Sequence, residues 1–99
     1  MKAIMNLVER INEELEDAKN YAESYIDCKS RENDGHANKY KEMSNDELKH
    51  ANYIHEIAIN EIDRLEKVFV PTEEMREVWR KSHALYVEKT AWIRQMLSM

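Results

Sequence analysis

Apolar residues recur every three or four positions along most of the chain, separated by charged and amide residues. This spacing gathers the apolar side chains on one face of a helix. Two segments interrupt it: residues 32–35 hold the only glycine, and residues 70–74 hold the only proline, followed by acids that suit a first helical turn. The pattern predicts three helices, over roughly residues 2–31, 36–69 and 72–98.

The second predicted helix contains a run of weak helix formers, Ser44-Asn45-Asp46. We expect the helix to continue through it, because the apolar spacing keeps its phase on both sides. The apolar faces comprise Ile4, Leu7, Val8, Ile11, Leu15, Ala18, Tyr21, Ala22, Tyr25 and Ile26 in the first helix; Tyr40, Met43, Ala51, Ile54, Ile57, Ala58, Ile62, Leu65, Val68 and Phe69 in the second; and Met75, Val78, Trp79, Leu85, Tyr86, Trp92, Ile93, Met96 and Leu97 in the third. These faces predict a helical bundle.

Glycine and proline are nearly absent, with one of each among 99 residues. A β-sandwich or barrel needs a turn about every 8–12 residues, and such turns are usually formed by glycine, proline or Asn-Gly. One glycine and one proline are too few for this. We therefore expect an all-α fold, a single domain over residues 1–99 built from three long antiparallel helices. Apolar residues make up 42% of the chain, too many for a disordered segment.

The chain carries a net charge of −5, from 15 Lys and Arg against 20 Asp and Glu. Nucleic acids and anionic membranes both bind basic surfaces, so neither is expected as a partner. The longest apolar run is too short to span a bilayer, and the N-terminal segment lacks the apolar core of a signal peptide. A lone cysteine, Cys28, builds no disulfide framework, so we expect a cytoplasmic protein.

Several polar side chains fall on the apolar faces. Glu14 lies on the apolar face of the first predicted helix. Glu47 and His50 lie at the centre of the apolar face of the second. Glu47 and His50 are three residues apart, so their side chains converge. A buried carboxylate must be paired, bound to a metal or protonated. The third helix adds Ser82 and Lys89 to its own face.

These side-chain types suit a transition-metal site. Glu-x-x-His on one helix, with a glutamate from a neighbouring helix, is the arrangement found in di-iron and di-manganese helical bundles. Carboxylate oxygens and neutral imidazole favour iron or manganese over a metal that prefers thiolate ligands. A metal-free alternative is a buried ion pair in which Lys89 neutralises Glu14 or Glu47. Lys89 can equally extend its ammonium group to solvent.

The segment Glu47-Leu-Lys-His50-Ala51, with Glu14 on the preceding helix and Tyr21 seven residues after it, resembles the ferritin-like superfamily. It is most similar to the first helical pair of a rubrerythrin or of the short encapsulated ferritins. The resemblance covers roughly residues 1–65. INEELEDAKNY and ELKHANYIHE also resemble segments of small proteins carried by phages of Gram-positive bacteria.

The resemblance implies a carboxylate-bridged di-metal centre that oxidises Fe(II), as a ferroxidase does, or handles oxygen or peroxide. By position, it makes Glu14 the terminal carboxylate, Glu47 the bridging carboxylate and His50 the imidazole ligand, with Tyr21 close by. A full ferritin-like bundle also brings a second glutamate and a second Glu-x-x-His, which the third helix lacks. The implied protein is therefore a ferritin-like half-bundle, completed when two or more copies assemble.

Two other functions remain open. One is a non-catalytic module that sequesters a host protein or a small nucleotide signal, with Arg10, Arg80, Tyr21 and Trp92 supplying the contacts. The other is a purely structural helical oligomer.

The remaining histidines are interpreted as surface residues. His36 lies at the start of the second helix, His55 points away from the apolar face, and His83 sits at the edge of its own. Glu61 is interpreted as an interfacial salt-bridge group and Cys28 as a half-buried packing residue.

Overall fold

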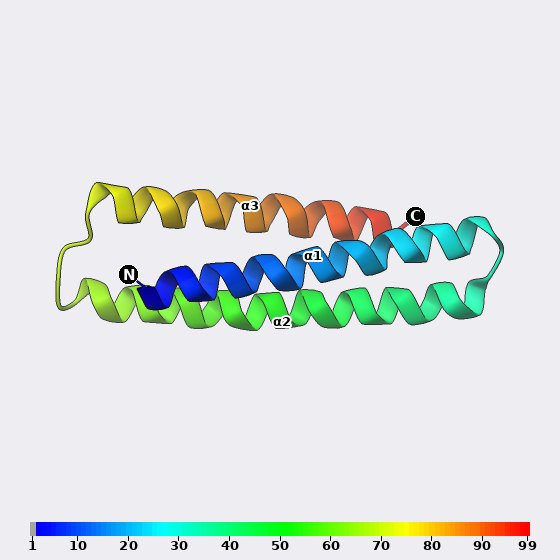
Figure 1. Cartoon of the computed structure of the whole chain (residues 1–99), viewed down its shortest axis with the longest axis horizontal. Coiled ribbons are helices and arrows are strands. Elements are labelled where there is room, and N and C mark those ends of the chain that lie inside the picture. The colour runs from blue at the N-terminus through cyan, green and yellow to red at the C-terminus, as the bar shows by residue number, and fades with distance from the viewer. Residues whose placement is uncertain (1) are drawn as a thin grey trace.

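The computed structural model describes residues 2–99, which form three helices (Figure 1): α1 Lys2–Ser30, α2 Asp34–Glu66 and α3 Glu73–Leu97. Consecutive helices run antiparallel, and the described residues extend over 55 × 17 × 17 Å. The predicted all-α fold of three helices is confirmed, and α2 continues through Ser44 to Asp46 as expected. Over residues 2–99, no helix is long and apolar enough to cross a membrane.

The turn between α1 and α2 lies where the sequence predicts it but does not depend on the glycine. Glu32 adopts the left-handed conformation, with φ of 60°. The Asn33 amide donates to the Cys28 carbonyl at 2.8 Å, and the Glu32 amide donates to the Lys29 carbonyl at 3.1 Å. These two bonds form a Schellman motif, which satisfies the last carbonyls of α1. Gly35 lies inside the first turn of α2.

Side-chain caps begin the second and third helices. Asn33 accepts a hydrogen bond from the His36 amide, so α2 starts two residues earlier than predicted. Thr72 accepts one from the Met75 amide at 3.2 Å, and the acids of the first turn of α3 favour the positive end of its dipole. At its other end α2 stops at Glu66, three residues before the predicted end.

Small residues of α2 pack against larger residues of α1 where the two helices meet. Four positions of α2, seven residues apart, are buried: Ala37, Ser44, Ala51 and Ala58. Four buried positions of α1 have the same seven-residue spacing: Ile4, Ile11, Ala18 and Tyr25. A seven-residue repeat keeps one seam facing its partner along the whole length of two helices. Because the α2 side chains are small, the two helix axes can approach closely.

One hydrogen bond fixes how the two helices are aligned. The Ser44 hydroxyl, which is fully buried, donates to the Ala18 carbonyl at 2.7 Å. The hydroxyl therefore needs no water, and its burial costs little. In an antiparallel pair this contact places Ile11 opposite Ala51 and Tyr25 opposite Ala37. We name these facing positions the small-residue seam.

The predicted apolar face of α2 is partly wrong. Ala51 and Ala58 are buried, but Met43, Ile57 and Val68 are 41%, 54% and 73% exposed. The close pairing of α1 with α2 selects small side chains for the centre of the contact, so the bulky ones lie at its margins or beyond it. In α3 the predicted core residue Trp92 is likewise 52% exposed. Its ring lies beside the Lys19 ammonium, 5.7 Å from the ring centroid.

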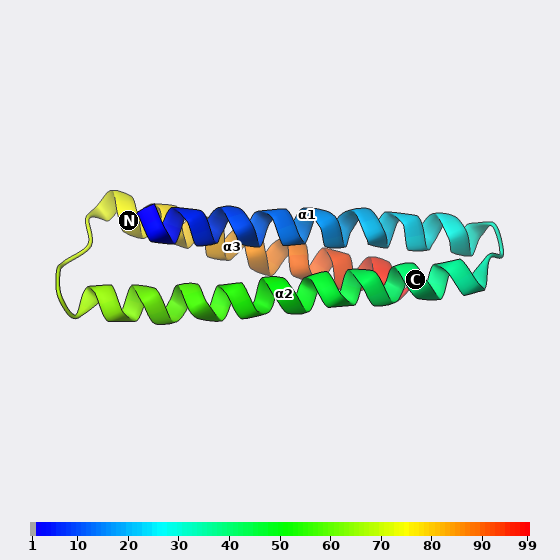
Figure 2. The ribbon, with the colours of Figure 1, turned by 60° about the horizontal axis from the view of Figure 1, so that its bottom comes forward.

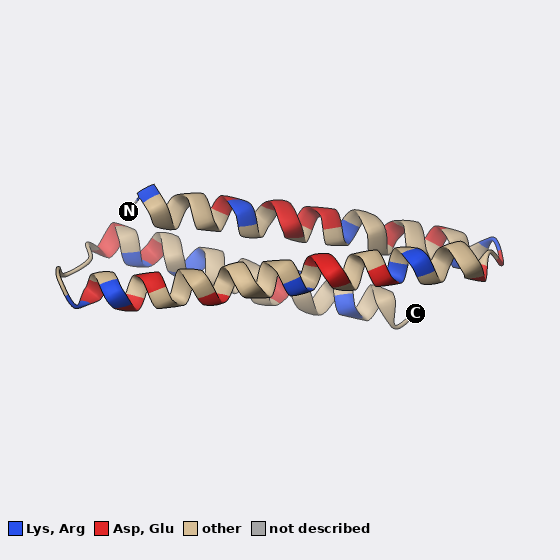
Figure 3. Ribbon diagram, turned by 90° about the horizontal axis from the view of Figure 1, so that it is seen from below, with Lys and Arg blue, Asp and Glu red and all other residues tan. Residues whose placement is uncertain are grey.

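The third helix packs along one side of this pair. Figure 2 shows α1 and α2 one above the other, with α3 running behind both. The buried residues of α3 all lie in its last two turns: Thr90, Ile93, Met96 and Leu97. In the first half of α3 the side chains are half-buried or exposed. Figure 3 shows Lys and Arg interspersed with Asp and Glu along all three helices.

The prediction that His55 lies on the surface is wrong. It is 7% exposed, because it occupies the same face of α2 as Ala51 and Ala58. Its Nε2 hydrogen-bonds to His83 Nδ1 at 2.9 Å, and its ring stacks on Tyr86 with centroids 4.2 Å apart.

Trp79 and Tyr86 complete the contact between α2 and α3 at this point. The Trp79 ring stacks on His55 with centroids 5.6 Å apart. The Tyr86 hydroxyl donates to Asn52 Oδ1 at 3.1 Å. We name His55, Trp79, His83 and Tyr86 the aromatic cluster. It joins the first half of α3 to α2.

Replacing a small residue in the seam is expected to force the helices apart. Ala51→Leu should lower the free energy of unfolding by about 1–3 kcal/mol, because the extra carbons have no space in a fully buried position. Urea denaturation followed by circular dichroism measures this. Ala84→Leu, at an exposed position of α3, is the matched control and should change stability by less than about 0.5 kcal/mol. Equal effects of the two substitutions would contradict the seam.

The aromatic cluster should weaken in acid. Burial, and to a lesser degree the charge of His83, lowers the pKa of His55 below 6.5, and Glu56 offsets this in part. Because the unfolded chain takes up the proton first, stability is full above about pH 6.5 and falls as the pH drops below it. His55→Phe keeps a stacked ring but removes the titrating group, so it should lose less stability than the wild type between pH 7 and pH 5.

Urea unfolding at several pH values, followed by tryptophan fluorescence, measures this difference. Tyr53→Phe, at a position of α2 that is 59% exposed, is the control and should follow the wild-type profile. A His55→Phe profile parallel to that of the wild type would show that His55 does not titrate on folding.

Candidate metal centre

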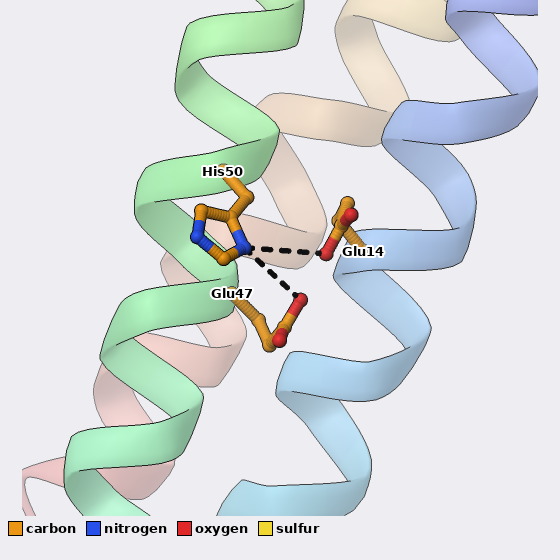
Figure 4. Close-up of side chains that lie close together, drawn as sticks. All are labelled: Glu14, Glu47 and His50. Atoms are coloured by element: carbon orange, nitrogen blue, oxygen red, sulfur yellow. Dashed lines mark ion pairs between the residues drawn. The ribbon is translucent and has the colours of Figure 1, made fainter.

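Two glutamates and one histidine converge between α1 and α2. Figure 4 shows Glu14 pointing from α1 toward Glu47 and His50, which come from successive turns of α2. His50 Nδ1 lies 3.7 Å from a carboxylate oxygen of Glu14 and 3.6 Å from one of Glu47. One ligand atom from each of the three residues lies within 4.8 Å of the others. The structure thus brings together all three residues that the sequence proposes as ligands.

The seam between the helices places these side chains. The bond from Ser44 to Ala18 aligns the two helices so that Glu14 stands beside Glu47. His50 follows one turn later on α2, where the three-residue spacing keeps it on the same side. Because the helices pair through small residues, side chains at the margin of the seam can reach across it.

The three side chains lie at the edge of the core, and the predicted central position is wrong. The Glu14 and Glu47 side chains are 26% and 21% exposed, and His50 is 55% exposed. In Figure 4 the α3 ribbon runs behind α1 and α2, with the three side chains in front. The cluster therefore opens to solvent on the side of the α1–α2 pair that α3 does not cover.

Glu47 holds its proton unusually tightly. Its pKa is raised from 4.5 to about 7, chiefly because it shares a hydrogen bond with Glu14. Partial burial and repulsion from the Glu14 charge raise the pKa further, while His50 acts in the opposite direction. Near neutral pH the two carboxylates therefore compete for one proton. A cation placed between them would remove the repulsion that keeps this proton bound.

The two other residues named from the sequence lie outside this cluster. Tyr21 stacks on Tyr40, with ring centroids 6.4 Å apart, two helical turns along α1 from Glu14. Lys89 lies on α3, and within residues 2–99 the ion pairs of Glu14 and Glu47 involve only His50. The alternative in which Lys89 neutralises these carboxylates is therefore not what the structure shows.

Glu61, interpreted from the sequence as an interfacial salt-bridge group, does form a salt bridge, but with Arg64 one turn away on the same helix, so the interfacial part of that prediction is wrong. The aromatic cluster is the group of residues that the sequence interpretation missed. Ala51, His55 and Ala58 share one helical face by their four- and three-residue spacing, and that spacing was the signal available.

The two carboxylates and the imidazole are ligands that suit a hard or borderline divalent cation. Carboxylate oxygens and imidazole nitrogens bind such ions at about 2.0–2.2 Å, so two ligand atoms on one ion stand at most about 4.4 Å apart. The nitrogen–oxygen distances of 3.6 and 3.7 Å already lie inside this limit. All three ligand atoms lie within 4.8 Å of one another, so small side-chain rotations are the most that one ion would require.

No family model matches the chain, and no curated protein or solved structure is significantly similar to it. The resemblance to the ferritin-like superfamily rests on the residues quoted above.

The raised pKa of Glu47 has a measurable cost in metal-free protein. A carboxyl group whose pKa is higher in the folded state contributes stability that is full below about pH 4.5 and is lost as the pH rises through 7. Glu47→Gln imitates the protonated group, so this variant should be more stable than the wild type at pH 8 and equally stable at pH 5. Urea unfolding in EDTA measures the difference. Glu13→Gln, next to Glu14 but exposed, removes the same charge and should show no such pH dependence. A pH-independent difference for Glu47→Gln would contradict the shared proton.

Proposed function

We propose that this protein is a ferritin-like helical metal-binding protein whose Glu14, Glu47 and His50 hold iron or manganese. The observation that carries the proposal is the convergence of two carboxylates and one imidazole from two helices on one point. The raised pKa of Glu47 supports it, because paired carboxylates that resist ionisation gain most from a bound cation. Iron bound by such ligands supplies one-electron chemistry toward oxygen.

A second copy of the chain would complete the site. Three ligands from one chain leave coordination positions open, and a di-metal centre in a helical bundle uses about twice that number. The exposed side of α2 also carries Met43, His50 and Ile57 at seven-residue spacing. An exposed seven-residue stripe with apolar members suits the packing of another helix. Two copies that meet on this stripe would bring four carboxylates and two imidazoles together.

The protonation of Glu47 makes the proposed binding depend on pH. Carboxylates must be ionised to bind a metal, so binding releases the proton that Glu47 shares with Glu14. Affinity should therefore rise as the pH increases from 6 to 8. The half-exposed His50 stays accessible from solvent and can receive the ion.

Titration with Mn(II) tests the proposal without the complication of iron oxidation. The wild type should bind about one Mn(II) per chain, the stoichiometry of a di-metal centre shared by two copies. Glu14→Gln, Glu47→Gln and His50→Ala should each weaken binding more than about tenfold, since even the loss of an outer partner costs that much. Calorimetry and elemental analysis measure affinity and content. Glu13→Gln, an exposed neighbour, is the matched control and should bind as the wild type does.

The role of the second copy is tested separately. Ile57→Ser removes an apolar side chain that is 54% exposed and leaves all three ligands in place. It should shift the protein toward monomer in analytical ultracentrifugation and weaken Mn(II) binding at the same time. Tight binding by a monomeric variant would show that one chain suffices. Unchanged binding by Glu47→Gln would refute the metal site itself.

A further inference from the structure

A second candidate binding site lies at the end of the bundle where α2 turns into α3. The linker and the first turns of α3 meet the N-terminal end of α1 there (Figure 1). The pocket between them has a volume of about 120 Å³ and opens to solvent. An engineered apolar cavity of roughly 150 Å³ is enough to bind benzene, so this pocket is large enough for one small apolar group.

The walls of the pocket are apolar and come from every part of the chain that meets there. They include Ile4 of α1, Leu65 of α2, Phe69 of the linker, and Met75 and Trp79 of α3. Leu65, Met75 and Trp79 are half-buried, and Phe69 is 40% exposed. A ligand that fills the pocket would cover apolar surface that now faces water, which favours binding.

The rim carries one charge of each sign. Glu66, the last residue of α2, and Arg76, in the first turns of α3, both line the pocket. Within residues 2–99 no ion pair joins them to each other or to any other residue; the ion pairs of the described chain lie elsewhere. A ligand with a single charge would be attracted by one rim group and repelled by the other. A zwitterion can satisfy both.

We propose that this pocket binds a small zwitterion with an apolar side group, the chemistry of a free apolar α-amino acid. The side group fills the space against Leu65, Met75 and Trp79, the amine faces Glu66 and the carboxylate faces Arg76. The site is separate from the proposed metal centre. Ile4 lies ten residues before Glu14, which is about 15 Å along α1.

Trp79 provides a direct reporter of binding. In a Trp92→Phe background it is the only tryptophan, because the chain has two and Trp92 lies about 20 Å further along α3 on an exposed site. Titration with L-leucine in metal-free buffer should change the Trp79 emission and reach saturation. It should also raise the melting temperature, since a ligand that binds only the folded state stabilises it.

Two analogues test the role of the rim charges. L-leucinamide lacks the carboxylate and 4-methylpentanoate lacks the amine, and each should bind about two- to fivefold more weakly than L-leucine, the range for one exposed ion pair. Arg76→Gln should weaken the binding of L-leucine by a similar factor and leave L-leucinamide no weaker. Equal affinities for the three compounds would overturn the zwitterion assignment.

Filling the pocket tests its location. Leu65→Phe and Met75→Phe each add volume at a lining position, and either folded variant should abolish the saturable response to L-leucine while keeping its helical circular dichroism. Retained saturation in both folded variants would place the ligand elsewhere. A response that never saturates with the wild type would overturn the proposal altogether.

Discussion

The close pairing of α1 with α2 is the constraint on which the other features depend. Four small residues of α2 at seven-residue spacing allow the approach, and the buried bond from Ser44 to Ala18 aligns the pair. Glu14 meets Glu47 only because the pair is close and aligned in this way. The same packing leaves bulky apolar side chains such as Met43 and Ile57 on the outer margin. There they are available to another helix.

The sequence predicts the architecture well, because one glycine, one proline and a steady helical spacing admit few alternatives. It also proposes Glu14, Glu47 and His50 as one group, because helical spacing puts each of them on the apolar face of its helix, although the alignment that brings them together comes from the packing. It fails where size matters more than hydrophobicity. His55 is buried in the face of Ala51 and Ala58, whereas Ile57 is exposed, and a ranking by apolar character reverses that order. The pocket beside Trp79 depends on where α3 lies, which no periodicity within one helix reports.

Two protonation equilibria act in opposite directions in this small fold. Folding raises the pKa of Glu47 and lowers that of His55. The contribution of Glu47 to the stability of the fold is lost as the solution becomes alkaline, and that of His55 is lost as it becomes acidic. For these two groups together, the metal-free chain is therefore most stable at an intermediate pH. The two groups also lie at different joints, one between α1 and α2 and the other between α2 and α3. A cation bound at Glu47 would remove the repulsion at the contact between α1 and α2 and would leave the contact between α2 and α3 unchanged.

The seven-residue repeat on both helices also has a consequence for assembly. A shift of one repeat would leave a mostly small-residue contact, yet it would set Glu14 beside Tyr40 or Ile54 and separate the two carboxylates. Within one chain the Schellman turn at Glu32 is too short to absorb that shift. Were two chains to exchange their second helices, this tether would be lost and the alignment would rest on Ser44 and on whatever binds the carboxylates. A metal ion bound by Glu14 and Glu47 would then select one register of α1 against α2 from several that are nearly equivalent in packing.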